Sequence, residues 1–238
     1  LLCTIDRIDF STEVVSAPGN NLNTPARRNL SGTSSTLYGY FAGGQGPGPG
    51  SFCVISRLDF STELVAAPPS GSQMSQNRNE FAAVQDISYG YFGGGAYPIA
   101  TPVEICIIER IDFSTDTVTP LGNLTRARNA LASVSSASYG YFSGGTAPPT
   151  FAPTTTNLID RIDFSTETTS SPGPLKNLLN ARYGHAGTSS GSYGYFGCGL
   201  DPTFFLSTVN RVDFTTESSA IIEKVLKSNQ SLTAIQAN

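Results

Sequence analysis

The segment Arg7-Ile8-Asp9-Phe10-Ser11-Thr12-Glu13, RIDFSTE in one-letter code, recurs along the 238-residue chain at intervals of about 50 residues. A second segment, YGYF, alternates with it and always runs into small residues and glycine. Such a period is typical of architectures that repeat one supersecondary unit. The first segment occurs as RIDFSTE at Arg7, RLDFSTE at Arg57, RIDFSTD at Arg110, RIDFSTE at Arg161 and RVDFTTE at Arg211, and YGYF begins at Tyr38, Tyr89, Tyr139 and Tyr193.

Both segments predict β-strands. In RIDF, Arg and Asp alternate with Ile and Phe, so the strand period of two puts the charged pair on one face and the apolar pair on the other. YGYF is short and aromatic and stops at glycine, as a buried strand before a turn does. Helical patterning is nearly absent, and its one plausible window, 220–227, suits a strand equally well. A weaker motif, an arginine before a run of small residues, precedes each YGYF as Arg28-Asn29-Leu30, Arg78-Asn79-Glu80, Arg128-Asn129-Ala130 and Arg182-Tyr183-Gly184.

Four short strands in each unit, with no helix, indicate an all-β protein built as a propeller of four-stranded antiparallel blades. The order of the motifs resembles kelch-type β-propeller repeats, in which an arginine strand, an aromatic strand ending in paired glycines and a strand with a polar turn follow one another. The resemblance covers essentially the whole chain. The chain departs from it by lacking the tryptophan after the polar turn, where it has Val14, Leu64, Val118 or Thr169.

The repeat predicts one propeller domain over residues 1–238, with about five blades. We call the strands of a blade a to d from the axis outwards. One closing blade is then shared between the two terminal segments, and the alternative is an arc of a larger ring. The predicted parts are strands c and d over 1–15, complete blades over 25–66, 78–119, 128–170 and 181–222, and strand a of the closing blade over 231–238.

The repeated charged residues are expected to be structural. Identical copies in blades that radiate from an axis cannot converge on one site. The Arg and Asp of one strand face can pair with the adjacent blade or, through the Asp, with the arginine before strand a, and the Asp can also cap amides of the polar turn. The residues concerned are Arg7, Asp9, Arg57, Asp59, Arg110, Asp112, Arg161, Asp163, Arg211 and Asp213.

Candidate binding residues lie in the b–c connections, which differ most between units. A fixed scaffold with variable loops on one face is where binding usually resides. The other interpretation is that most of these aromatic side chains fold back over the blade ends. The candidates are Phe52, Tyr97, Phe151, Phe204 and Phe205.

Composition and spacing argue against several classes of function. The 14 basic and 18 acidic residues give a formal net charge of −4, which disfavours a nucleic-acid partner, and no apolar run suggests membrane insertion. The single histidine, His185, predicts no catalytic site. No metal motif or cofactor cradle is present, so neither a metal nor a cofactor is expected. The four cysteines are expected to be small buried residues without disulfides.

These expectations predict a non-enzymatic structural or adhesion module that binds a protein or a cell-surface glycan. The residue sequences RIDFSTE and YGYFGGG also resemble kelch-like repeats in tail proteins of tailed bacteriophages, especially marine ones. That resemblance implies a virion or extracellular location. The alternatives are a lectin-type propeller with a sugar pocket in each blade and a soluble cytoplasmic kelch-like scaffold. Self-assembly through the terminal half-blades is a further expectation.

Overall fold

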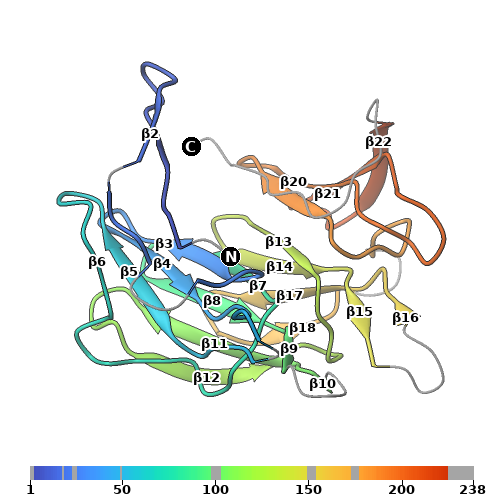
Figure 1. The fold of residues 1–238 in the computed structure, drawn as a ribbon. Coiled ribbons are helices and arrows are strands. Elements are labelled where there is room, and N and C mark those ends of the chain that lie inside the picture. The colour runs from blue at the N-terminus through green and yellow to red at the C-terminus, as the bar shows by residue number, and fades with distance from the viewer. Residues whose placement is uncertain are drawn as a thin grey trace.

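The chain folds entirely into β-structure in the parts that the computed structural model describes, which are residues 3–17, 19–22, 26–48, 50–97, 103–148, 154–172 and 177–224. The regular elements within these ranges are all strands, and the described part of the window that could have been helical, 220–224, lies in β22 (Ser219–Lys224). Four antiparallel sheets of four strands dominate the molecule (Figure 1). The predicted all-β class and the repeated four-stranded unit are therefore confirmed.

Each four-stranded sheet follows the chain from its innermost strand to its outermost strand. Equivalent innermost strands of consecutive sheets contact one another, so the sheets lie in one series. The first sheet has β3 (Ser31–Ser34), β4 (Tyr38–Ala42), β5 (Ile55–Asp59) and β6 (Val65–Ala66); the second has β7 (Ala82–Gln85), β8 (Tyr89–Gly93), β11 (Ile107–Asp112) and β12 (Val118–Asn123); the third has β13 (Ala132–Ser135), β14 (Tyr139–Ser143), β17 (Ile159–Asp163) and β18 (Thr169–Ser170); and the fourth has β19 (Ala186–Ser189), β20 (Tyr193–Gly197), β21 (Thr208–Asp213) and β22.

Three small two-stranded hairpins accompany the four sheets. The first, β1 (Arg7–Ile8) with β2 (Val15–Ser16), projects from the rest of the molecule at the upper left of Figure 1. The other two are the b–c connections of the second and third sheets, β9 (Ala96–Tyr97) with β10 (Val103–Glu104) and β15 (Thr146–Ala147) with β16 (Thr154–Thr155). The strand predicted over 231–238 lies outside the described residues, which show no closure of the sheets into a ring.

The register places the two main motifs side by side. The second tyrosine of YGYF lies opposite the motif arginine, as Tyr91 lies opposite Arg110, so both project from the same face of the sheet. We call this the forward face, because it is turned toward the next sheet along the chain. The opposite, backward face carries the YGYF phenylalanine and the RIDF isoleucine and phenylalanine. This division is the alternation that RIDF predicts.

The apolar core lies between consecutive sheets. Tyr91 of the second sheet packs in one cluster with Phe142 and Ile162 of the third sheet, all three fully buried. Equivalent clusters form around Tyr40 and around Tyr141. Small residues in the strands make this approach possible: a Cβ on Gly140 would lie 2.4 Å from a methyl carbon of Val84 on the preceding sheet.

A buried arginine lies at the start of each sheet, and in the first sheet it is not the residue that the motif predicts. Arg27 is buried and Arg28 is exposed, so the alignment of Arg28 with Arg78 is wrong by one position. The correct spacing from the arginine to YGYF is the same in all four units, which is the signal that identifies Arg27. Its guanidinium donates to the hydroxyl of Ser56 at 2.8 Å.

The buried arginines differ in their counter-charge. Arg78 and Arg128 pair with Glu109 and Asp160 at 2.5 and 2.7 Å, and all four side chains are fully buried. Arg182 is equally buried, but the residue that corresponds to Asp160 is Asn210. Arg182 donates only to carbonyl and hydroxyl oxygens among the described residues, and burial lowers its pKa to about 10. It therefore remains charged at neutral pH without an acidic partner there.

Replacing Asn210 by Asp should stabilise the fold, because a carboxylate would face Arg182 as Asp160 faces Arg128. We expect the free energy of unfolding, measured by urea denaturation at neutral pH, to rise by about 1–3 kcal/mol. The matched control Asp160→Asn should lower it by about 3–5 kcal/mol, because it removes the charge that compensates a buried guanidinium. Equal losses in both variants would contradict this interpretation of Arg182.

Candidate interaction surfaces

The motif arginines connect neighbouring sheets through ion pairs. Arg110 of the second sheet pairs with Glu167 of the third at 2.5 Å, and its guanidinium also lies over the ring of Tyr89, 4.3 Å from the centroid. The same pairing recurs in one direction along the chain, from the RIDF arginine of one unit to the last residue of the polar turn in the next. The pairs are Arg7–Glu63, Arg57–Asp116, Arg110–Glu167 and Arg161–Glu217.

An aromatic stack accompanies the ion pairs between the four sheets. The RIDF phenylalanine of one sheet lies nearly parallel to the second YGYF tyrosine of the preceding sheet, with centroids 5.2 Å apart for Tyr91 and Phe164. Tyr40 with Phe113 and Tyr141 with Phe214 repeat this geometry. We call the ion pair and the stack together the cross-sheet joint. The charged motif residues thus pair with the adjacent unit, one of the two roles expected from the sequence.

The motif aspartates hold the polar turns. Asp112 Oδ1 accepts hydrogen bonds from the backbone amide and the hydroxyl of Ser114, at 2.8 and 2.6 Å. These bonds, chiefly that of the Ser114 hydroxyl, hold the pKa of Asp112 below its ordinary value, so their stabilising effect is lost as the pH falls through that lowered pKa. Equivalent bonds form at Asp9, Asp59, Asp163 and Asp213.

The acid that ends each turn has an unfavourable backbone conformation. Glu167 has a φ of 55°, in the left-handed region where a glycine or asparagine would be less strained, and Glu63, Asp116 and Glu217 share it. The local cost of such a conformation is about 1–3 kcal/mol. The carboxylate is placed by this turn to meet the arginine of the preceding sheet, so the joint offsets strain within the turn.

The predicted binding aromatics of the b–c connections fall into two groups. Phe52 is half-buried and folds back toward Gly46, where a Cβ would meet its ring at 3.0 Å. Phe204, Phe205 and Tyr97 instead face solvent, with exposed fractions of 71%, 51% and 39%. Phe151 lies outside the described residues. Each of the two interpretations of these side chains therefore describes part of the set.

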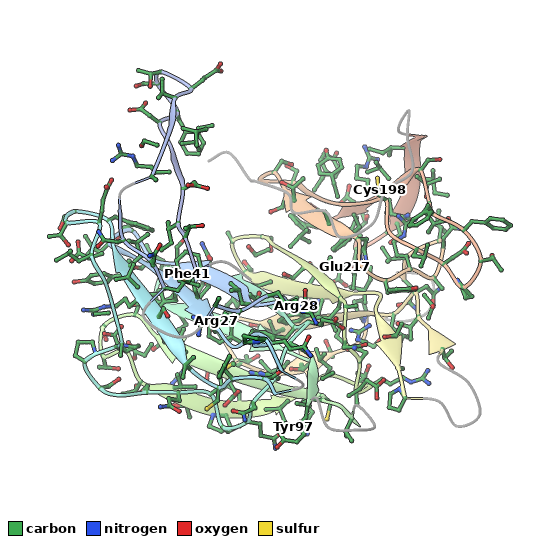
Figure 2. The ribbon with its side chains drawn as sticks, viewed as in Figure 1. Arg27, Arg28, Phe41, Tyr97, Cys198 and Glu217 are labelled. Atoms are coloured by element: carbon green, nitrogen blue, oxygen red, sulfur yellow. The ribbon has the colours of Figure 1, made fainter. Side chains whose placement is uncertain are left out.

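The exposed aromatics sit on ordered but dissimilar supports. Phe204 follows a tight turn in which Asp201 Oδ1 accepts from the amides of Thr203 and Phe204, both at 2.7 Å. Tyr97 belongs to the β9–β10 hairpin, opposite exposed Val103. Tyr97 lies at the lower edge of the molecule in Figure 2, well away from Cys198 in the fourth sheet. The loops thus present separate apolar spots rather than one shared pocket.

The innermost strands line two cavities that sequence reasoning did not single out. One, of about 210 Å³, is bounded by β7, β13 and β19, and the other, of about 330 Å³, continues toward His185. The wall of the first is made of small or polar side chains, including Gln85, Ser133 and Thr188, whereas the second also contains Leu30, Phe81 and Leu131. The run of small residues before each YGYF was the available signal, because strands without bulky side chains leave space where they converge.

His185 is a core residue with one polar contact. Its Nε2 lies 2.9 Å from Ser143 Oγ, and Ser143 is fully buried. Burial, and secondarily the charges of Arg182 and Arg128, lower the pKa of His185 to about 3, so the ring is neutral at pH 7. Nδ1 has no partner among the described residues, so no carboxylate orients the ring as a catalytic triad would require.

The cysteines are only partly as predicted. Cys198 is buried, but Cys3, Cys53 and Cys106 are half-buried, which corrects the expectation that all four are buried. All four are free thiols. Over the described ranges, no three His, Cys, Asp or Glu side chains gather as a metal site would require. No helix in those ranges is long and apolar enough to cross a membrane.

Comparison with known proteins adds no relative. The chain matches no protein-family model, and no curated protein is significantly similar to it.

Replacing Arg110 by Ala should loosen the joint between the second and third sheets. The half-buried pair with Glu167 and the contact with Tyr89 would both be lost, so we expect a fall of about 1–2 kcal/mol in the free energy of unfolding. Arg110→Lys keeps the charge and should lose less. Binding per folded molecule should be unchanged, and loss of binding at an unchanged melting temperature would show that Arg110 contacts a ligand.

Proposed function

We propose that the four sheets are blades of a kelch-like β-propeller, with β1–β2 as the outer half of a fifth, incomplete blade. This proposal is supported by the motif order in the sequence, by the contacts between innermost strands of consecutive sheets, and by the recurrence of one cross-sheet joint. The blades supply a rigid frame in which most aromatic residues are committed to packing. The aromatic side chains outside the repeat are then those available for binding.

The propeller serves as a non-enzymatic structural or adhesion module that binds a protein or a cell-surface glycan through its b–c loops. The exposure of Phe204, Phe205 and Tyr97 on loops of different sequence is the observation that carries this proposal. Aromatic residues exposed on a rigid support lose little conformational freedom on binding, which makes them effective contact residues. A phage-tail or other extracellular location rests on the resemblance of the repeat sequence to phage tail proteins.

A lectin with one sugar pocket in each blade is less well supported. The cavity of about 340 Å³ between the first two sheets contains Leu37 and the strongly exposed Ile87. The corresponding positions in the third unit are Ser138 and Ala137, and in the fourth Ser192 and Gly191. Because the wall chemistry changes between units, a repeated pocket for one sugar is not favoured, and binding through separate contacts on unlike loops is preferred.

The loop proposal is tested with the triple variant Tyr97→Ser, Phe204→Ser and Phe205→Ser. We expect capture of the protein by a panel of immobilised glycans and by intact bacterial cells to fall about tenfold or more, with an unchanged melting temperature. The matched control Ile87→Ser removes an exposed apolar side chain from the opposite end of the sheets and should leave capture intact. Capture that survives the triple variant but not the control would overturn the assignment to the loops.

A further inference from the structure

The cross-sheet joint is a two-sided contact, and the described part of the chain contains one unmatched copy of each side. Each joint between the described sheets needs a tyrosine and an arginine on a forward face, and a phenylalanine and an acid on the following unit. Among the described residues, the series of units runs from the hairpin β1–β2 to the fourth sheet. The forward face of the fourth sheet and the leading side of the hairpin are therefore the two unmatched halves.

The fourth sheet presents the tyrosine and arginine half. Tyr195 lies opposite Arg211 in the register, as Tyr91 lies opposite Arg110. Arg211 is held over the ring of Tyr193, 4.5 Å from the centroid, but it has no acidic partner among the described residues. Tyr195 is partly exposed and stacks on no phenylalanine of the described residues, whereas its three counterparts are fully buried.

The backbone just after β20 also differs from the equivalent position in the other units. A Cβ on Gly144 would lie 2.4 Å from the carbonyl oxygen of Arg182 in the following sheet. The corresponding residue of the fourth sheet is Cys198, which has a φ of 58°. A side chain is tolerated there because no arginine segment of a following sheet covers it in the described part of the chain. The neighbour that fits this face therefore carries no such segment.

The hairpin presents the phenylalanine and acid half. Phe10 is 80% exposed, and Ile8 is 43% exposed although its counterparts in the second to fourth sheets are buried. Glu13 has a φ of 56°, the conformation that aims the turn acids at the preceding arginine, but it is exposed and unpaired within the described residues. In those residues the hairpin also has no inner strands and no arginine segment. It would therefore bring no arginine-segment carbonyl against the side chain of Cys198.

We propose that the forward face of the fourth sheet binds the β1–β2 hairpin of a second copy of this chain. Phe10 then stacks on Tyr195, Glu13 pairs with Arg211, and Ile8 packs beside the tyrosine. The surface continues an interface that already recurs three times between the four sheets, and its charges are complementary. Because the two halves lie on different parts of the surface, the contact is heterologous and joins copies head to tail.

A second copy fits better than the chain's own hairpin. The hairpin is already attached to the first sheet, through the Arg7–Glu63 pair and through Asn20, whose Nδ2 donates to the carbonyl oxygen of Glu63 at 2.6 Å. The fourth sheet lies apart from the hairpin, at the upper right of Figure 1. Closure within one chain would require the series of sheets to shift, whereas a second copy meets the face without such a change.

Charge exchange between two variants tests the proposal. Sedimentation velocity over a concentration series should show that the mass of the wild-type protein rises with concentration. Arg211→Glu and Glu13→Arg should each weaken association about tenfold or more, because each places like charges opposite one another. An equimolar mixture of the two variants should recover association, since Glu13 of one variant can pair with Arg211 of the other, and the two substituted residues also carry opposite charges. Arg28→Glu, an equal charge change on an exposed arginine away from the joint, should have no effect.

The outcomes separate the possible occupants of the face. A mixture that associates while neither variant does alone supports the proposal. A wild-type protein that remains monomeric overturns it, as do single variants that associate normally. If the double variant Arg211→Glu with Glu13→Arg instead restores a lowered melting temperature without any change in mass, the occupant is the chain's own hairpin. Because the loop aromatics are intact in all these variants, glycan or cell capture reports separately on the proposed loop function.

Discussion

The contact between the tyrosine–arginine face of one sheet and the phenylalanine–acid edge of the next determines how this molecule is built. A single sheet of four short strands exposes two faces and cannot bury its apolar side chains alone. In the joint, a stacked aromatic pair lies beside an arginine that is itself paired with the acid of the following turn, as in Tyr91, Phe164, Arg110 and Glu167. Each sheet therefore depends on its neighbours, as in other repeat proteins.

Several residues carry a local cost that contacts distant in the sequence offset: the neighbouring sheet does so for the turn acids, and the same sheet does so for the buried arginines. The turn acids have positive φ, and the arginines before the innermost strands are buried with their charge. Where the counter-charge is present, as for Arg78 and Arg128, the charge is compensated. In the first and fourth sheets it is not, because Ser56 and Asn210 replace the acid. The buried arginines of the first and fourth sheets, Arg27 and Arg182, thus lack, among the described residues, the acidic partner that the two middle sheets supply.

The period of the sequence was sufficient to predict the strands and their order, because RIDF and YGYF alternate in the way a strand requires. It could not identify the partners of the motif arginines, which are 56 to 59 residues away and belong to another unit. The choice of Arg28 over Arg27 failed because two adjacent arginines stand before the small residues; the constant spacing to YGYF identifies Arg27, and its burial agrees. The exposure of the loop aromatics likewise depends on turns, such as that of Asp201, which have no counterpart in the repeat.

The claim that one joint holds the sheets together is tested most directly by a double-mutant cycle on Tyr91 and Phe164. The two single substitutions to leucine and the double substitution would be compared by urea denaturation. A coupling free energy of about 0.5–1.5 kcal/mol is expected for a stacked pair that links the second and third sheets. A coupling free energy near zero would show that the rings only fill space and that the sheets are held together by other contacts.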